Sequence, residues 1–427
     1  MNETKKVRVA LVGIRGLPAQ YGGSETAAAE IYPRLAARGH DAVVYCRRHK
    51  VDPRQRWYEG VRTVVLPSVN TKALDTITAS FLALIDLVIN DRADIVHVHG
   101  IGNAILFPLF RLFGKRVVTA VDGMDWTRAK WSLAERAYLR LALYMAVHWA
   151  DGVYVDSREA KRLCQTIYGR EFPHIAYGTQ IRCEAGTDAL KRHGLEAEKY
   201  ILFVGRLIPE KGVHYLIDAY RKLETDFPLV IVGDNPYHPA YVQRLKDGAD
   251  DRVRFVGPEF GEAFWELCAN CYVYVQPSEV EGTSPVLLSA MGCGRCVVVN
   301  GIQENLDAVG DAGLAFFRND VDDLAALLAE LVAKPTWVRK LGAAAQEHAR
   351  REYDWDRITD QHEELFRVVL SRHEERSWSP FRILRTRGLR SAGATSAAGE
   401  GSGRRCPAPT ESSPSNPKGL GQDASRC

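Results

Sequence analysis

Short apolar runs alternate with longer stretches of helical periodicity in two separate series along this chain. The runs are almost continuously apolar, as strands are when helices cover both faces of a parallel sheet. The first series comprises VRVALV, DAVVY, TVVL, DIVHVH, RVVTAVD and GVYVD, and the second comprises YILFVG, LVIVG, VRFVG, VYVQPS and CVVVN. The sequence therefore predicts an α/β protein with two doubly wound, Rossmann-like domains.

The length of 427 residues agrees with two such domains. We expect the domains at 1–181 and 200–353, joined by a polar linker over 182–199 and followed by an amphipathic closing helix over 354–371. From residue 376 the composition shifts to Gly, Ser, Pro, Ala and Arg, which predicts a disordered basic tail over 376–427. Domains of this class bind ligands beyond the carboxyl ends of their strands, so we expect a cleft between the two.

The net charge of +3 is unevenly distributed. The tail holds nine Arg or Lys against three Asp or Glu, so it carries +6 and the remainder of the chain carries −3. The folded body thus lacks the basic footprint of a nucleic-acid-binding protein. Within the tail, FRILRTRGLR mixes apolar and basic residues. Contact with a membrane surface and a solvated segment without a partner both stay open.

No stretch offers the roughly 20 apolar residues of a spanning helix, and the N-terminus does not resemble a secretory signal. We therefore expect a cytoplasmic protein, with peripheral contact to the inner face of the cell membrane as an option. Nine cysteines, an odd number in a long chain, agree with this. The pairs Cys268/Cys271 and Cys293/Cys296 adjoin apolar strands, so we favour core residues over structural zinc.

The segment GIRGLPAQYGGSET follows the first apolar run. Its glycine spacing departs from the G-x-G-x-x-G of dinucleotide loops, and the second strand ends without an acid for a ribose, so an NAD site is disfavoured. Gly22 and Gly23 precede Ser24, which we expect to be the N-cap of a helix. Such a loop suits close approach of an anion to backbone amides. A tight turn without a ligand is the alternative.

Two segments of the second series carry charged residues at strand ends. GRLIPEKG places Arg206 and Lys211 after the first strand, and both side-chain types suit phosphate. QPSEVEGTSPVLLSAMGCG places Glu279 and Glu281 after a later strand, and Pro285 then opens a helix. This pattern provides carboxylates for sugar hydroxyls and helix amides for an oxyanion.

Together these segments resemble the two-domain GT-B glycosyltransferases of the retaining family 4. GIRGLPAQYGGSET and VDGMDWTRAKW are similar to a rhamnosyltransferase-like subgroup, whose N-terminal domain is of the type named domain of unknown function 1972. The resemblance covers residues 7–370. GGSET, GRLIPEKG and EGTSPVLLSAMGCG are jointly specific in this order and spacing, although each alone is a weak signal.

The resemblance implies transfer from a nucleotide-diphosphate sugar, with the donor in the C-terminal domain, the acceptor in the N-terminal domain, and no metal or other cofactor. Arg206 and Lys211 match the cations that neutralise the departing diphosphate. Glu281 matches the first of the family's paired glutamates, near the donor sugar. Further donor-binding positions are Gly22, Gly23, Gly205, Gly282, Thr283, Ser284 and Ser289.

Ser289 is a departure, because the family usually has a second glutamate there that binds the ribose hydroxyls. Losing a charged hydrogen-bond partner removes roughly 1.5–3 kcal/mol, or one to two decades of donor affinity. The change fits a deoxythymidine diphosphate donor, and it also fits a weak or inactive enzyme. We favour an active enzyme because the phosphate-facing residues are intact.

On the acceptor side, the candidate catalytic residue Asp122 occupies the strand end where the wider family often has a His near the sugar. We further expect Asp125 to contact sugar or acceptor hydroxyls, and Arg128 and Lys130 to meet an acceptor phosphate. A surface loop with local salt bridges is the alternative for this segment.

Two strand ends add weaker candidates. His97 and His99 alternate on one strand and should point to opposite faces, with His99 the candidate for lining the cleft. Asn300, Glu304 and Asn305 follow the CVVVN strand and are candidates near the donor.

The resemblance thus implies a glycosyltransferase that adds rhamnose or another hexose, with retention, to a polysaccharide or lipid-linked saccharide precursor. One alternative is a nucleotide-sugar epimerase of the same architecture. Another is a non-catalytic partner that binds a nucleotide sugar during polysaccharide assembly.

Overall fold

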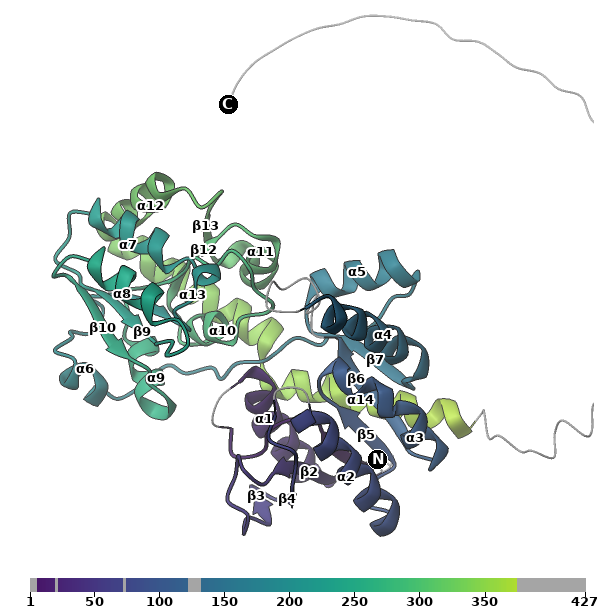
Figure 1. Cartoon of the computed structure of the whole chain (residues 1–427). Coiled ribbons are helices and arrows are strands. Elements are labelled where there is room, and N and C mark those ends of the chain that lie inside the picture. Colours follow the sequence, from purple (N-terminus) through teal and green to yellow (C-terminus); the bar gives the residue numbers. More distant parts are fainter. Residues whose placement is uncertain (1–5, 20–21, 72–73, 122–131, 375–427) are drawn as a thin grey trace, which may run out of the picture. The chain divides into compact units, whose positions relative to one another are not determined.

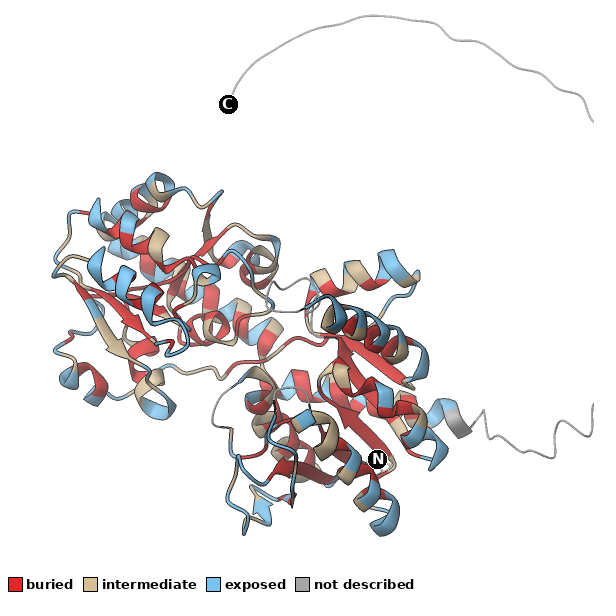
Figure 2. Cartoon of the chain, viewed as in Figure 1, coloured by how far each residue is buried: buried red, intermediate tan, exposed pale blue. Residues whose placement is uncertain are grey.

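A computed structural model describes residues 6–19, 22–71, 74–121 and 132–374. It contains two domains, each built on a parallel sheet with helices on both faces (Figure 1). The strands are largely buried, and the helices turn their exposed residues outward (Figure 2). The predicted pair of doubly wound α/β domains is confirmed.

The sheet of the first domain has seven strands in the order β3-β4-β2-β1-β5-β6-β7. Neighbouring strands are parallel, except that β3 is antiparallel to β4. The order reverses between β1 and β5, which is where ligands approach sheets of this type. The strands are β1 (Arg8–Val12), β2 (Asp41–Arg47), β3 (Trp57–Tyr58), β4 (Val61–Leu66), β5 (Ile95–Val98), β6 (Arg116–Val121) and β7 (Gly152–Val155).

Helices cover both faces of this sheet. On one face α1 and α14 join Leu11, Val44 and Ile95 in a core, and on the other face α2, α3 and α4 pack against Val43 and Val96. The helices are α1 (Gly23–Ala37), α2 (Leu74–Asn90), the 3-10 helix η1 (Ile101–Leu106), α3 (Phe107–Leu112), α4 (Leu133–Trp149), α5 (Arg158–Tyr168) and α14 (Trp355–Glu374).

The sheet of the second domain has six parallel strands in the order β10-β9-β8-β11-β12-β13. They are β8 (Ile201–Val204), β9 (Leu229–Val232), β10 (Val253–Gly257), β11 (Val273–Gln276), β12 (Cys296–Asn300) and β13 (Leu314–Phe316). The helices are α6 (Asp188–Arg192), η3 (Pro209–Lys211), α7 (Val213–Arg221), α8 (Pro239–Asp247), α9 (Gly261–Ala269), α10 (Pro285–Gly292), α11 (Gln303–Val309), η4 (Gly310–Ala312), α12 (Val321–Ala333) and α13 (Pro335–Tyr353).

The segment 182–199, expected to be a linker, contains α6. Ala189, Leu190 and Leu195 are buried in the core of the second domain. The polar residues of this segment face solvent, so its composition concealed the apolar side that packs.

The four cysteines of the two C-x-x-C pairs are buried free thiols in the core of the second domain. Burial raises the pKa of Cys271, and it raises the pKa of Cys296 to about 12. Both thiols are therefore protonated core residues, as the sequence favoured. Among the described residues, no group of three or more His, Cys, Asp or Glu side chains is arranged to hold a metal ion.

The closing helix α14 follows the second domain but packs on the first. Its Val369 lies against Gly152 at the start of β7, where a Cβ would come within 2.7 Å of Val369 Cγ2. Arg38, the C-cap of α1, donates to Glu363 Oε2 over 3.1 Å. An apolar contact and a charged contact therefore both fix this helix.

A buried histidine of α14 adds a titratable group to this contact. The ring of His362 lies 5.7 Å from that of His97 and 5.1 Å from that of Tyr154. His362 Nδ1 donates to the carbonyl oxygen of Ile358 over 2.9 Å. Burial lowers the pKa of His362 from 6.5 to about 4. The folded protein therefore holds this imidazole neutral at pH 7.

Gly152→Ala tests the docking of α14. The added Cβ would come within 2.7 Å of Val369 and 3.2 Å of Val118, so we expect the free energy of unfolding to fall by about 1–3 kcal/mol. Denaturant titration measures this beside the control Gly102→Ala, whose Cβ would have its nearest neighbour at 3.9 Å. Equal stability of the two variants would contradict tight packing at Gly152.

The pKa of His362 predicts acid sensitivity. Because folding lowers this pKa from 6.5 to about 4, its stabilisation is complete above pH 6.5 and is lost as the pH falls to 4. The loss amounts to about 3 kcal/mol for a shift of this size. We expect His362→Leu to lose less stability than the wild type between pH 7 and 4.5 in thermal unfolding. The exposed His148→Leu serves as the control and should follow the wild type.

Candidate functional site

Two loops of the second domain lie side by side beyond the carboxyl ends of β8 and β11. Gly212 has a φ of +66°, and a Cβ there would lie 2.0 Å from the carbonyl oxygen of Pro277. The amide of Glu279 donates to the carbonyl oxygen of Glu210 over 2.9 Å. The close backbone approach at Gly212 requires glycine. It brings the GRLIPEKG segment next to the loop that precedes α10.

Lys211 and Glu281 form an ion pair where these loops meet. The side chains are 19% and 9% exposed, so the pair is well shielded but still reaches the surface. Gln276 Nε2 donates to the same Glu281 Oε1 over 3.2 Å. The carboxylate thus holds one cation and one amide in a fixed arrangement.

Gln276 ends β11 and is 2% exposed. Its Oε1 accepts hydrogen bonds from the hydroxyls of Tyr274 at 2.8 Å and Ser284 at 3.1 Å. Gln276 was not among the residues predicted from the sequence. As the one polar residue at the end of an apolar strand, it follows the same strand-end rule that selected its neighbours.

The candidates after β12 belong to the same hydrogen-bond network. Asn305 Oδ1 accepts from Gln276 over 3.5 Å, and Asn305 Nδ2 donates to the carbonyl oxygen of Asn300 over 3.0 Å. Asn300 Nδ2 in turn donates to Asn319 Oδ1 over 2.6 Å. Asn300 and Asn305 are buried and support the loops, whereas Glu304 hydrogen-bonds Glu159 and helps raise the pKa of that group to about 7.

Arg206 differs from Lys211 in its surroundings. Its side chain is exposed, and it has no hydrogen bond or ion pair within the described ranges. Gly205 precedes it, and the amide of Gly205 donates to the carbonyl oxygen of Val232 over 3.0 Å. The backbone here is therefore fixed while the guanidinium stays available to a ligand.

The start of α10 carries the next group of candidates. Ser284 is its N-cap and accepts from the amide of Leu287 over 3.5 Å, and Gly282 has open space around it. Thr283 Oγ1 donates to the carbonyl oxygen of Asp156 at the end of β7 over 3.0 Å. This hydrogen bond joins the donor-side loop to the carboxyl edge of the first sheet.

Ser289 lies one turn into α10. It is mostly buried, and its Oγ donates to the carbonyl oxygen of Pro285 over 2.9 Å. The hydroxyl proton is therefore already donated within the helix, so the Ser289 oxygen can only accept a hydrogen bond from a ligand.

The glycine loop of the first domain differs from its prediction in one respect. The N-cap of α1 is Gly22, with φ 120°, and Ser24 lies inside the helix, so the expected Ser24 cap is wrong. The buried carboxylate of Glu25 explains this, because its Oε1 accepts from the amide of Arg15 over 3.0 Å. A Cβ on Gly22 would lie 2.3 Å from Glu25 Oε2, so only glycine leaves room for that carboxylate.

Gly23 lies beside the other domain's loop. A Cβ on Gly23 would be 3.5 Å from Pro285 Cγ and 3.6 Å from Tyr177 Cζ. The glycine loop and the start of α10 are therefore in contact range.

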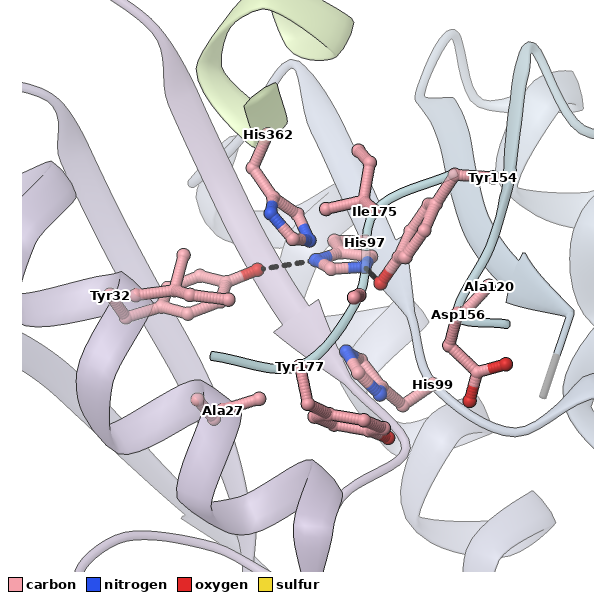
Figure 3. A pocket seen from close by; sticks show the side chains of 13 residues that line it. Ala27, Tyr32, His97, His99, Ala120, Tyr154, Asp156, Ile175, Tyr177 and His362 are labelled. Atoms are coloured by element: carbon pink, nitrogen blue, oxygen red, sulfur yellow. Dashed lines mark hydrogen bonds between the residues drawn. The ribbon is translucent and has the colours of Figure 1, made fainter. Parts of the chain in front are cut away.

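A cavity of about 20 Å³ lies next to the carboxyl ends of β5 and β7 (Figure 3). It has room for about one water molecule. His97 Nδ1 lies 3.0 Å from the hydroxyl of Tyr32, and His97 Nε2 lies 2.9 Å from the hydroxyl of Tyr154. Because a neutral imidazole has one donor and one acceptor nitrogen, one tyrosine donates and the other accepts.

His99 lines the same cavity as His97, with ring centroids 4.7 Å apart (Figure 3). The expectation that the two point to opposite faces is wrong, because β5 ends at Val98 and the chain turns at Gly100, with φ 79°. Burial lowers the pKa of His99 to about 4. Its Nδ1 is buried without a hydrogen-bond partner in the described part of the chain.

Several lining residues of this cavity were not predicted. Asp156 ends the GVYVD strand and could have been found by the strand-end rule, whereas Tyr32, Tyr177 and His362 come from helices or a loop with no such signal. The acceptor-side candidates Asp122, Asp125, Arg128 and Lys130 lie outside the described residues.

Comparison with known proteins assigns a family description to each domain. Residues 21–176 match the family described as Glycosyltransferase Family 4, and residues 198–334 match the family described as Glycosyl transferases group 1. The N-acetyl-alpha-D-glucosaminyl L-malate synthase of Bacillus anthracis is 28% identical over 386 residues, which are 84% of this chain and 97% of that protein.

Solved structures share the fold. The sucrose-phosphate synthase of Thermosynechococcus elongatus superposes with a TM-score of 0.71 at 21% identity, over 85% of this chain and 99% of that one. HepE of Anabaena, solved in complex with UDP-glucose, gives a TM-score of 0.68 at 19% identity, over 86% and 99%.

These relatives are synthases and glycosyltransferases, so nothing in them favours the epimerase alternative. None of the matches described here singles out the rhamnosyltransferase-like subgroup, which stays a prediction. Two family matches, one in each domain, and a shared fold over most of the chain lead to one assignment. The chain is a GT-B glycosyltransferase of the group 1 and family 4 superfamily.

Proposed function

We propose that this glycosyltransferase moves a hexose from a nucleotide-diphosphate sugar to a polysaccharide or lipid-linked saccharide precursor, with retention and without a metal. The observation that carries this proposal is the Lys211–Glu281 pair at the start of α10. A cation there would lie near the N-terminus of α10, and a lysine and a helix N-terminus both attract a diphosphate. The HepE structure with bound UDP-glucose supports a nucleotide sugar as the donor class.

Two cations would neutralise the leaving diphosphate, with Lys211 held by Glu281 and Arg206 extending freely. Arg206 presents a planar fork that suits two phosphate oxygens, and Lys211 acts as a point charge. As the bond from the sugar to the diphosphate breaks, negative charge grows on the phosphate oxygen, which is where fixed positive charge lowers the barrier.

The acceptor would attack from the same face that the diphosphate leaves, which retains the anomeric configuration. The acceptor hydroxyl loses its proton as its oxygen bonds to the sugar, and the leaving phosphate oxygen takes that proton. Glu281 would then orient Lys211 and contact the donor sugar rather than act as a general base.

Ser289 bears on the identity of the nucleotide. A glutamate at this position would accept hydrogen bonds from ribose hydroxyls, whereas the Ser289 hydroxyl already donates to Pro285. This favours a donor that needs less from this position, such as a deoxythymidine diphosphate sugar. The same feature favours the second candidate, a non-catalytic protein that binds a nucleotide sugar.

Loss of the proposed cations tests the site. We expect Lys211→Ala to lower the transfer rate by about 10²–10³-fold, since that is the effect of removing one fixed stabiliser of a developing anion. Transfer of radiolabelled sugar from a panel of nucleotide sugars into lipid-linked saccharides measures the rate. Lys222→Ala, which removes an exposed lysine paired with Asp322, is the control. Normal transfer by the double variant Arg206→Ala/Lys211→Ala would refute the assignment, and no transfer by the wild type would favour the non-catalytic candidate.

Restoring the missing acid tests the donor idea. We expect Ser289→Glu to bind UDP about 10–100-fold more tightly than the wild type, because a charged acceptor gains the ribose hydroxyls. Calorimetric titration with UDP and with deoxythymidine diphosphate measures this, and Ser289→Ala is the control for loss of the hydroxyl. An unchanged affinity for UDP would mean that position 289 does not contact the ribose.

A further inference from the structure

The helices on one face of the first sheet expose three apolar stripes. On α2 the stripe is Phe81, Ile85 and Ile89; on η1 and α3 it is Ile105, Leu109 and Leu112; on α4 it is Leu141 and Tyr144, and we call these residues the outer apolar surface. Ile89 and Leu112 are 74% and 75% exposed. Figure 2 shows exposed residues along these helices.

The stripes repeat every three or four residues, so each follows one side of its helix. The opposite side of each helix is already packed in the core, as Leu87 of α2, Phe110 of α3 and Ala146 of α4 show. Folding of the domain therefore buries only the inner sides of these helices. The outer apolar surface is left for another contact.

The helices that carry the three stripes are neighbours. η1 contacts both α2 and α4, and α3 contacts α4. All of these helices cover the same side of the sheet and contribute to the same core. A soluble monomer rarely exposes a contiguous apolar area of this kind, and such areas mark sites of protein or membrane contact.

The charges around this surface distinguish between partners. Its acids are neutralised within the domain: Asp86 accepts from Arg92 over 2.7 Å, and Asp91 pairs with Lys115 over 2.6 Å. Arg140, exposed on α4 directly before Leu141, has no ion pair within the described ranges. The uncompensated charge on this side is therefore positive.

The most exposed part of the surface lies at the edge where the strands begin. α2, α3 and α4 all end there, with Ile89, Leu112 and Trp149 at or near their last turns. α14 ends at the same edge, because Arg116 at the start of β6 donates to the carbonyl oxygen of Leu370 over 3.4 Å. From α14 the sequence continues into residues 376–427, which carry a net charge of +6.

We propose that the outer apolar surface docks on a bilayer that contains anionic lipids. Apolar side chains would enter the boundary between head groups and acyl chains, and Arg140 and the basic C-terminal segment would be attracted to anionic head groups. A second copy of this chain would present the same positive charge and is the less complementary occupant. No helix within the described ranges is long and apolar enough to cross a membrane, so the contact is peripheral.

Vesicle sedimentation of the full chain tests this inference, which does not depend on the proposed sugar transfer. We expect binding to vesicles of phosphatidylcholine with about 30% phosphatidylglycerol, a lipid with an anionic head group. Binding should be weaker in high salt, and binding to vesicles of phosphatidylcholine alone should be slight. Ile89→Glu and Leu112→Glu should each weaken binding by about tenfold or more. Both side chains are exposed, so thermal unfolding of these variants should match the wild type.

The control is Ile167→Glu on α5, which removes an isoleucine that is 51% exposed and lies outside the surface. Two results would overturn the proposal. One is vesicle binding that is absent, or that Ile89→Glu and Leu112→Glu leave as strong as the wild type. The other is a dimer, seen by light scattering without lipid, that Leu112→Glu converts to a monomer, because the surface would then serve a second copy.

Discussion

The buried side-chain amide of Gln276 determines the position of the Lys211 ammonium in the second domain. Gln276 accepts two hydroxyl hydrogen bonds at its oxygen, from Tyr274 and Ser284, so its nitrogen must face Glu281. Glu281 in turn holds the Lys211 ammonium. Reversing the amide would turn its oxygen toward the Glu281 carboxylate, which only accepts hydrogen bonds, so the loss of this contact would cost about 1–3 kcal/mol. The lysine is therefore placed before any ligand arrives, which is the condition under which fixed charge speeds a reaction.

The same amide links this charge to a helix N-terminus. Ser284 donates to Gln276 while it caps α10 by accepting from Leu287. A movement of β11 would thus shift both Lys211 and the N-terminus of α10. The first domain contributes differently, because the carboxylate of Glu25 already occupies the N-terminal turn of α1. In our proposal the cations for a diphosphate are therefore Arg206 and Lys211 of the second domain, and the glycine loop contributes only its close backbone approach.

Much of this arrangement could be predicted because it depends on position along strands. Continuous apolar runs gave both sheets, and the rule that ligands gather at carboxyl ends selected Lys211, Glu281 and Ser284. The alternation of side chains along a strand, which placed His97 and His99 on opposite faces, failed because it depends on where the strand ends. His99 lies one residue beyond β5, so it turns into the cavity beside His97 instead of away from it.

Other residues gave no local signal. Tyr32 and His362 meet His97 from two helices on the same face of the sheet, and nothing in the sequence near either residue marks it as a neighbour of β5. The strands β3 and β13 have two and three residues, too few to differ from a loop in their apolar pattern. Such elements are fixed by the strands beside them rather than by their own residues.

The helices on the two faces of the first sheet differ in the residues on their outer sides. On the face of α1 and α14, outward positions carry charged residues that pair with one another, such as Arg34 with Asp356. On the face of α2, α3 and α4, outward positions carry Ile85, Ile89 and Leu112. The helices on both faces have the apolar periodicity of helices that pack on a sheet, because their inner sides are alike. The difference lies in the outer sides, which folding does not need. Apolar residues there increase the risk of aggregation and gain nothing for the core, which is why we propose that these helices contact a bilayer.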